Sequence, residues 1–188
     1  MKKLLFILIL LSVSFGSCAQ RNFAAKKLLI GGGFHCPDIG DSFQGGIVAY
    51  KFSPSDACYI AGCHGIIAMT TDLSTGAVWG CSGTNISTSQ TICSGVSNTN
   101  NIISGCSTVG IAAELCYNYT DGTYSDWILP SQDELQRCIL NIPSYFVSGV
   151  YYWSSHQVSS TQAVKLSTAR ITFDSKSSSL RVKAIRYF

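Results

Sequence analysis

The distribution of apolar and polar residues divides the chain into a leader and a series of short elements. Residues 4–15 are almost continuously apolar, whereas the later apolar runs are short and separated by Gly, Ser, Thr and Asn. Short apolar runs between turn residues predict β-strands. We therefore expect strands at residues 45–52, 65–70, 127–129, 150–153, 163–166, 170–173 and 180–188.

Two segments carry a helical pattern instead. Apolar residues recur at every fourth position within residues 108–119, which places them on one face of a helix. Ser131 is followed three residues later by Glu134, a capping box that begins a second helix. The polar stretch 82–107 predicts a long loop held by cysteines. Strands and two short helices in separate blocks predict an α+β fold with an antiparallel, disulfide-stapled sheet.

The leader predicts export. Lys2 and Lys3 precede the apolar run, and small residues follow it, as in secretory signal peptides. The run is shorter than the roughly 20 residues that a membrane-spanning helix needs. We assign residues 1–17 to a signal peptide, 18–43 to an N-terminal tether and 44–188 to a single domain.

The cleavage site allows two interpretations. Gly16-Ser17-Cys18 resembles a bacterial lipobox, in which lipid on Cys18 anchors the mature protein to a membrane. That interpretation places the protein at the outer membrane or cell surface. Cleavage after Ala19 by ordinary signal peptidase is the alternative, and it gives a periplasmic or secreted soluble protein.

The nine cysteines predict disulfides, because exported proteins mature in oxidising compartments. Without Cys18, eight remain, enough for four bridges: Cys36, Cys58, Cys63, Cys81, Cys93, Cys106, Cys116 and Cys138. A helix over residues 108–119 separates Cys106 from Cys116 by roughly 12 Å. A disulfide reaches about 7 Å between Cα atoms, so Cys106 is expected to pair with Cys81 or Cys93.

Other pairings follow from position in the chain. Cys58 and Cys63 are close enough in sequence to close a small loop, and Cys116 and Cys138 lie on the two predicted helices. Zinc at Cys58, Cys63 and His64 is the metal alternative. Because structural zinc sites carry a second closely spaced ligand pair and none follows here, we expect no metal.

Charge is sparse and unevenly distributed. Only 12% of residues are charged and the formal net charge is +3, which argues against nucleic-acid binding by an exported domain. Positive charge gathers near the end of the chain, where Asp174 is the sole acid among Lys165, Arg170, Lys176, Arg181, Lys183 and Arg186. Two interpretations remain open: solvated strands whose cations protect a sheet edge, or a face that binds anions.

Three motifs together resemble a known family. D-W-I-L-P-S-Q-D-E-L at residues 126–135 is followed by Y-W-S-S at 152–155 and R-V-K-A-I-R at 181–186. Their order is similar to that of the C-terminal domain of the Legionella collagen-like adhesin. H-G-I-I-A at 64–68 and G-I-A-A-E-L-C at 110–116 extend the resemblance.

The resemblance implies a C-type-lectin-like fold and a surface adhesin. The namesake domain binds sulfated glycosaminoglycans and trimerises, so the resemblance leaves oligomerisation open here. No collagen-like repeat precedes the domain, and the calcium signatures E-P-N and W-N-D are absent. Ile128, His156 and Lys183 also depart from the residues common in the family.

The candidate ligand-binding residues combine an aromatic ring, hydroxyls and cations, the groups that stack on sugars and bind acidic substituents. They are Trp153, Ser154, Ser155, His156, Arg170, Arg181 and Lys183. Arg186 is expected to pair with Asp126 or Asp133.

Nothing in the sequence indicates catalysis or a cofactor. The three histidines are not accompanied by a nucleophile motif such as G-x-S-x-G. We therefore expect a non-catalytic envelope binding module that recognises a glycan, sulfated or acidic, or a protein of the envelope or host surface. The alternative is an accessory lipoprotein subunit held permanently in an envelope complex.

Overall fold

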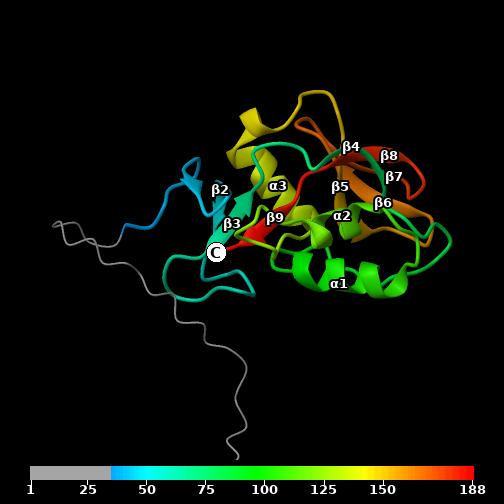
Figure 1. The fold of residues 1–188 in the computed structure, drawn as a ribbon, viewed down its shortest axis with the longest axis horizontal. Helices are drawn as coiled ribbons and strands as arrows, with labels where there is room; N and C mark the ends of the chain where they lie inside the picture. The colour runs from blue at the N-terminus through cyan, green and yellow to red at the C-terminus, as the bar shows by residue number, and fades with distance from the viewer. Residues whose placement is uncertain (1–34) are drawn as a thin grey trace, which may run out of the picture. The chain divides into compact units, whose positions relative to one another are not determined.

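Two β-sheets and three α-helices make up residues 35–188, the part of the chain that the structure, a computed structural model, describes (Figure 1). The predicted signal peptide, the lipidation site Cys18 and most of the tether lie outside the described residues. No helix within residues 35–188 is long and apolar enough to cross a membrane.

The first sheet has the strand order β1-β2-β3-β9, with every neighbouring pair antiparallel. Its strands are β1 (Ser42–Phe43), β2 (Gly46–Lys51), β3 (Gly65–Ala68) and β9 (Ile185–Tyr187). The predicted strands at 45–52 and 65–70 are confirmed as β2 and β3. The predicted strand at 127–129 is wrong, because Ile128 makes only an isolated bridge to Ile185.

The second sheet has the order β4-β8-β5-β6-β7. Its strands are β4 (Ser74–Val78), β5 (Tyr152–Gln157), β6 (Gln162–Leu166), β7 (Ile171–Ser175) and β8 (Ser179–Val182). All pairs are antiparallel except β5 with β8. β4 and β7 therefore form the two edges of this sheet.

The predicted strand at 180–188 is two strands that belong to different sheets. The chain leaves the second sheet after Val182 and joins the first at Ile185, with Lys183 and Ala184 between. The Met69 N–H donates to the Ala184 carbonyl at 3.1 Å across this crossing. One short segment thus ties the two sheets together.

Three helices cover the sheets: α1 (Gly95–Gly105), α2 (Ala112–Asn118) and α3 (Gln132–Asn141). A 3₁₀ turn, η1 (Pro143–Tyr145), follows α3. The predicted helices at 108–119 and after Ser131 are confirmed as α2 and α3. The prediction of only two helices is wrong, since α1 lies within the stretch that its composition had marked as a loop.

Neighbouring residues of the central strands point into two different hydrophobic cores. Ile67 and Trp153 pack with residues of α1 and α2, whereas Ile66 and Tyr152 pack with residues of α3. Successive strand residues face opposite sides of a sheet. The α+β architecture therefore has α1 and α2 on one side of the sheets and α3 on the other.

The three tryptophans are buried, with 1% exposure or less. The Trp79 indole N–H donates to the Ser154 carbonyl at 2.9 Å, and the Trp153 N–H donates to the Ala77 carbonyl at 2.9 Å. These two bonds cross-link β5 to β4 and to the segment after it. The Trp127 N–H has no hydrogen-bond partner among the described residues, and its ring packs edge-on against Tyr119.

Within residues 35–188, three disulfides join loops around this framework. Cys81–Cys106 (Cα–Cα 5.6 Å) confirms one of the two expected partners of Cys106. The expected Cys58–Cys63 pair is wrong, because Cys58 bonds Cys93 and Cys63 bonds Cys36. Because both sulfurs are in disulfides, Cys58 and Cys63 do not provide the thiolates that the zinc alternative requires.

The expected bridge between Cys116 and Cys138 is also wrong. Both are free, fully buried thiols. Cys116 lies in the core under α1 and α2, and Cys138 lies in the core under α3. The sheets lie between these two cores, so the two thiols cannot meet and form a disulfide.

Candidate functional site

The aromatic and hydroxyl part of the predicted site is buried within β5. Trp153, Ser154 and Ser155 each have 0% exposure. The Ser154 hydroxyl donates to the Val164 carbonyl at 3.0 Å, and the Ser155 hydroxyl accepts from the Asn98 side chain at 2.9 Å. Ser154 thus joins β5 to β6, and Ser155 joins β5 to α1. None of the three side chains reaches a ligand arriving from solvent, which corrects their assignment as ligand contacts.

His156 follows them at the partly exposed end of β5. Its Nδ1 lies 3.3 Å from the Gln132 Oε1 at the start of α3. Burial lowers the pKa of His156, and the nearby Asp133 carboxylate partly offsets that shift. Burial thus favours the neutral form of His156, which makes it a poor cation for a binding site.

Most cations near the end of the chain have acidic partners, so few of them are available to bind an anion on the predicted face. Arg186 pairs with Asp126 (Nε–Oδ1 2.6 Å), as expected from the sequence, and stacks on the Tyr124 ring. Lys165 pairs with Asp174 on the neighbouring strand. Lys176 is wholly buried.

Arg181 and Lys183 do come together, around Asp72. Arg181 Nη1 lies 2.6 Å from Asp72 Oδ2, and Lys183 Nζ lies 3.0 Å from Asp72 Oδ1. Their alternation along the last strand predicted a shared face, and the structure places them so. Sequence analysis missed Asp72, because no motif surrounds it and its loop lies more than a hundred residues away.

The two cations differ in access. The Lys183 side chain is 1% exposed and its ammonium lies 5.1 Å from the centre of the Phe146 ring. The Arg181 side chain is 27% exposed, and Asp72 engages only its Nη1 nitrogen. A guanidinium has five N–H donors, so Arg181 keeps donors that a ligand can use.

These residues lie along an open groove with a volume of about 520 Å³. One wall carries hydroxyls from Thr70, Thr71 and Thr75, and the other comes from the segment after α3. We call this the Asp72 groove, and its lining residues are Thr70, Thr71, Asp72, Thr75, Ser144, Tyr145, Phe146, Val147, Arg181 and Lys183.

Hydrogen bonds fix the acid at the centre of the Asp72 groove. The Tyr152 hydroxyl donates to Asp72 Oδ2 at 3.1 Å and accepts from the Val147 N–H at 3.0 Å. Burial raises the pKa of Tyr152, and the Asp72 charge adds to that rise. Two cations face one carboxylate, which leaves the groove with an excess of positive charge.

Burial lowers the pKa of Lys183, and the hydrogen bond and charge of Asp72 oppose that shift. Asp72 therefore favours the charged form of Lys183 within the core. In this arrangement Asp72 and Lys183 form an internal pair, and Arg181 is the cation directed to solvent.

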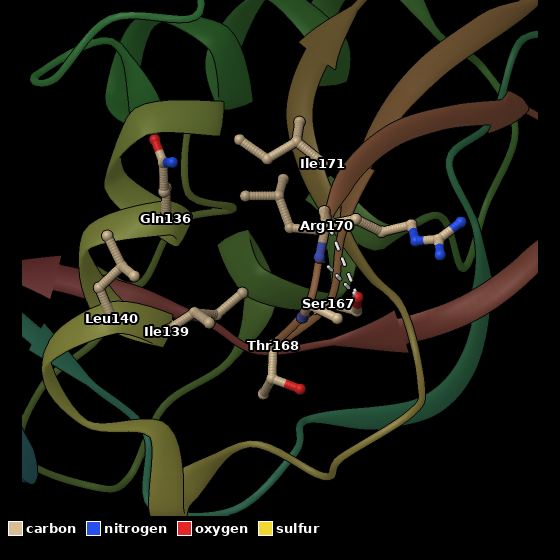
Figure 2. A pocket seen from close by; sticks show the side chains of 9 residues that line it. Gln136, Ile139, Leu140, Ser167, Thr168, Arg170 and Ile171 are labelled. Carbon is tan, nitrogen blue, oxygen red and sulfur yellow. Dashed lines mark hydrogen bonds between the residues drawn. The ribbon is translucent and has the colours of Figure 1, made fainter.

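Arg170, the remaining predicted cation, lies elsewhere. It is exposed in the turn between β6 and β7, beside a second hollow of about 200 Å³ that α3 and this turn enclose. Figure 2 shows the Arg170 side chain pointing away from α3, whereas Ile171 points towards it. Arg170 belongs to the opposite edge of the sheet from β4 and β8, so it does not share a site with Arg181 and Lys183.

No cluster of three or more potential metal ligands occurs within residues 35–188. His64, part of the zinc alternative, has its Nδ1 3.1 Å from the Phe188 carbonyl. A scan against protein-family models finds no match for this chain, and neither does a search of curated proteins.

Proposed function

We propose that this chain is an exported, non-catalytic binding module of the bacterial cell envelope that takes an acidic or sulfated glycan in the Asp72 groove. The observation that carries the proposal is the partly exposed Arg181 in a groove with more cations than acids. A guanidinium with spare donors suits a carboxylate or sulfate, which it can bind through two parallel hydrogen bonds.

The remaining lining of the Asp72 groove supports a sugar rather than a lipid or a nucleic acid. Threonine and serine hydroxyls donate to and accept from sugar hydroxyls, and Tyr145 adds an aromatic ring. The groove is open, so internal units of a polymer can lie in it as readily as a chain end.

Export and fold are parts of the same proposal. Three disulfides support maturation in an oxidising compartment. We place the mature protein at the outer membrane or cell surface, attached through lipid on Cys18. The α+β architecture is compatible with the C-type-lectin-like fold that the sequence motifs imply, and we propose that fold for residues 44–188.

The test is direct binding of the disulfide-intact protein to heparin-derived and neutral oligosaccharides of equal length. We expect chelator-insensitive binding to the sulfated series that weakens with salt, because ionic contacts are screened. Arg181→Gln should weaken it by about tenfold or more, as expected for one lost charge-assisted hydrogen bond. Asp72 keeps Lys183 and Tyr152 as partners in this variant, so the fold should persist.

Arg137→Gln is the matched control, because Arg137 is an exposed cation on α3 that does not line the Asp72 groove. Its binding should equal that of the wild type. Equal loss in both variants would show that net charge alone drives binding and would remove the groove from the proposal. No binding in either oligosaccharide series would favour the accessory-subunit function.

A further inference from the structure

The β7 edge of the second sheet is open and apolar. Ile171 is 43% exposed and Phe173 is 52% exposed, on the same face of an edge strand. Leu140 of α3, 63% exposed, lies across the hollow from Ile171. Edge strands of stable monomers usually carry charged residues, Pro or a bulge that prevents pairing. Residues 171–175 contain no Pro or bulge, and their one charged residue, Asp174, pairs with Lys165 of its own chain.

The main-chain groups of Ile171 and Phe173 face outward. The Ser167 N–H donates to the Arg170 carbonyl at 2.9 Å, and the Lys176 N–H donates to the Thr161 carbonyl at 2.9 Å. Because hydrogen-bonded residues alternate along an antiparallel strand, the even-numbered residues of β7 bond to β6. Ile171 and Phe173 therefore present a free N–H and C=O each at the sheet edge.

Charges flank this strand on its other face. The Arg170 guanidinium has no hydrogen-bond or ion-pair partner within residues 35–188, and Asp174 pairs with Lys165 of its own chain. Arg170 and Asp174 are four residues apart, so their side chains share the face opposite Ile171 and Phe173. Figure 2 shows the Arg170 and Ile171 side chains pointing in opposite directions.

We propose that the β7 edge pairs with the β7 edge of a second copy of this chain, antiparallel and about a two-fold axis through Thr172. In this register Ile171 of one copy faces Phe173 of the other, and each such pair exchanges both of its main-chain hydrogen bonds. The same register sets Arg170 opposite Asp174 of the other copy, twice by symmetry.

The self-complementarity of residues 170–174 is what selects a second copy over another partner. One register pairs the outward main-chain groups of Ile171 and Phe173, both apolar side chains and both unlike charges at once. The aromatic ring of Phe173 lies next to Ile171 of the other copy, at the mouth of the hollow that Leu140 borders. The pairing adds one short strand per copy, so the dimer is of the weak, concentration-dependent class.

The surface is separate from the Asp72 groove, which lies beside β4 and β8 at the other edge of the same sheet. Dimerisation and glycan binding can therefore fail or succeed independently.

Sedimentation of the disulfide-bonded compact unit, residues 36–188, over a concentration series tests the proposal without the lipid anchor. The test exchanges the two charges that the dimer would pair. Arg170→Glu alone and Asp174→Lys alone each set like charges opposite one another in a homodimer, and each should raise the dimer dissociation constant about tenfold or more. Mixed in equal amounts, the two variants should form a heterodimer. The introduced glutamate of one variant then faces the introduced lysine of the other, and the unchanged Asp174 of the first faces the unchanged Arg170 of the second.

Phe173→Thr removes the apolar contact without altering charge and should also yield monomer. Arg137→Glu carries the same charge change as Arg170→Glu at an exposed site on α3 and should dimerise like the wild type. Thermal unfolding of each variant controls for folding, since Asp174 also pairs with Lys165. A wild-type protein that stays monomeric up to about 1 mM, a concentration that equals the dissociation constant of a very weak complex, would overturn the proposal, as would variants that do not recombine.

Discussion

Lys176 is a buried cation without an acidic partner among residues 35–188. Its ammonium donates to the Thr84 carbonyl at 2.8 Å and to the Gln157 Oε1 at 2.6 Å, and it lies 4.4 Å from the centre of the Trp79 ring. Burial lowers the pKa of Lys176 to about 8. Sequence analysis counted Lys176 among surface cations, because a charge count carries no information on which lysines the fold encloses.

The depressed pKa of Lys176 makes stability depend on pH. Between about pH 8 and 10.5 the unfolded chain binds more protons at this position than the folded chain, so the contribution of Lys176 to the free energy of unfolding rises with pH. We expect wild type to gain stability relative to Lys176→Met across this window in urea unfolding. The buried tyrosines and thiols have raised pKa values, which make stability fall as pH rises. Their contribution is the same in both proteins, so it cancels when the free energy of unfolding of the variant is subtracted from that of wild type. Parallel pH profiles for the two proteins would contradict this prediction.

At the scale of elements, Glu134 connects three parts of the fold. Within the capping box of α3 it accepts from the Ser131 N–H at 2.7 Å. It also accepts from the Cys93 N–H at 2.8 Å, at the start of α1, and from the Tyr187 hydroxyl of β9. Burial raises the pKa of Glu134, and these donors oppose the rise. A local sequence signal thus predicted the start of α3 correctly and missed the tertiary role of the same side chain.

The helix α1 shows why part of the fold was not predictable. Its sequence is Gly, Ser, Asn and Thr with few apolar residues, and its N-cap Ser94 makes no capping bond. Disulfides fix its two ends instead, Cys58–Cys93 before it and Cys81–Cys106 after it. A Cβ at Gly95 would collide with the Glu134 carboxylate, so glycine is needed there for close packing. Tertiary contacts outweigh weak local propensity in this segment.

The capping box gives a prediction at the same scale. Ser131→Ala removes an acceptor for the Glu134 N–H and a hydroxyl donor to the Thr91 carbonyl. We expect a loss of about 1–2 kcal/mol in the free energy of unfolding, measured by chemical denaturation. Ser97→Ala on the exposed side of α1 is the control and should change stability by no more than about 0.5 kcal/mol. A stable Ser131→Ala protein would show that the cap is dispensable.

For the whole molecule, residues Cys36–Phe188 form one compact unit held by three disulfides. The cysteine count predicted a disulfide-stapled domain, and this is confirmed. The count did not predict which cysteines stay reduced, because pairing depends on which side of the sheets each helix packs. The same limit applies to the site, since the sequence predicted Arg181 and Lys183 but not the loop that brings Asp72 to them.

The two buried thiols give a whole-molecule prediction. Burial raises the pKa of Cys116 and of Cys138, so neither forms a reactive thiolate in the folded protein. Alkylation followed by peptide mapping should leave both unmodified in the native state and modify both after unfolding without reductant. The six bridged cysteines should resist in both conditions. A peptide linking Cys116 to Cys138 would contradict the structure.

The Asp72 groove and the β7 edge lie at opposite edges of one five-stranded sheet. Joining two copies through β7 would leave their grooves at the far ends of a continuous sheet. Two rigidly spaced sites gain avidity only on a polymer long enough to reach both. Such a pair would respond to the length of an acidic polysaccharide and to the spacing of its charges, and fragments too short to bridge would compete poorly however well they fit a single groove.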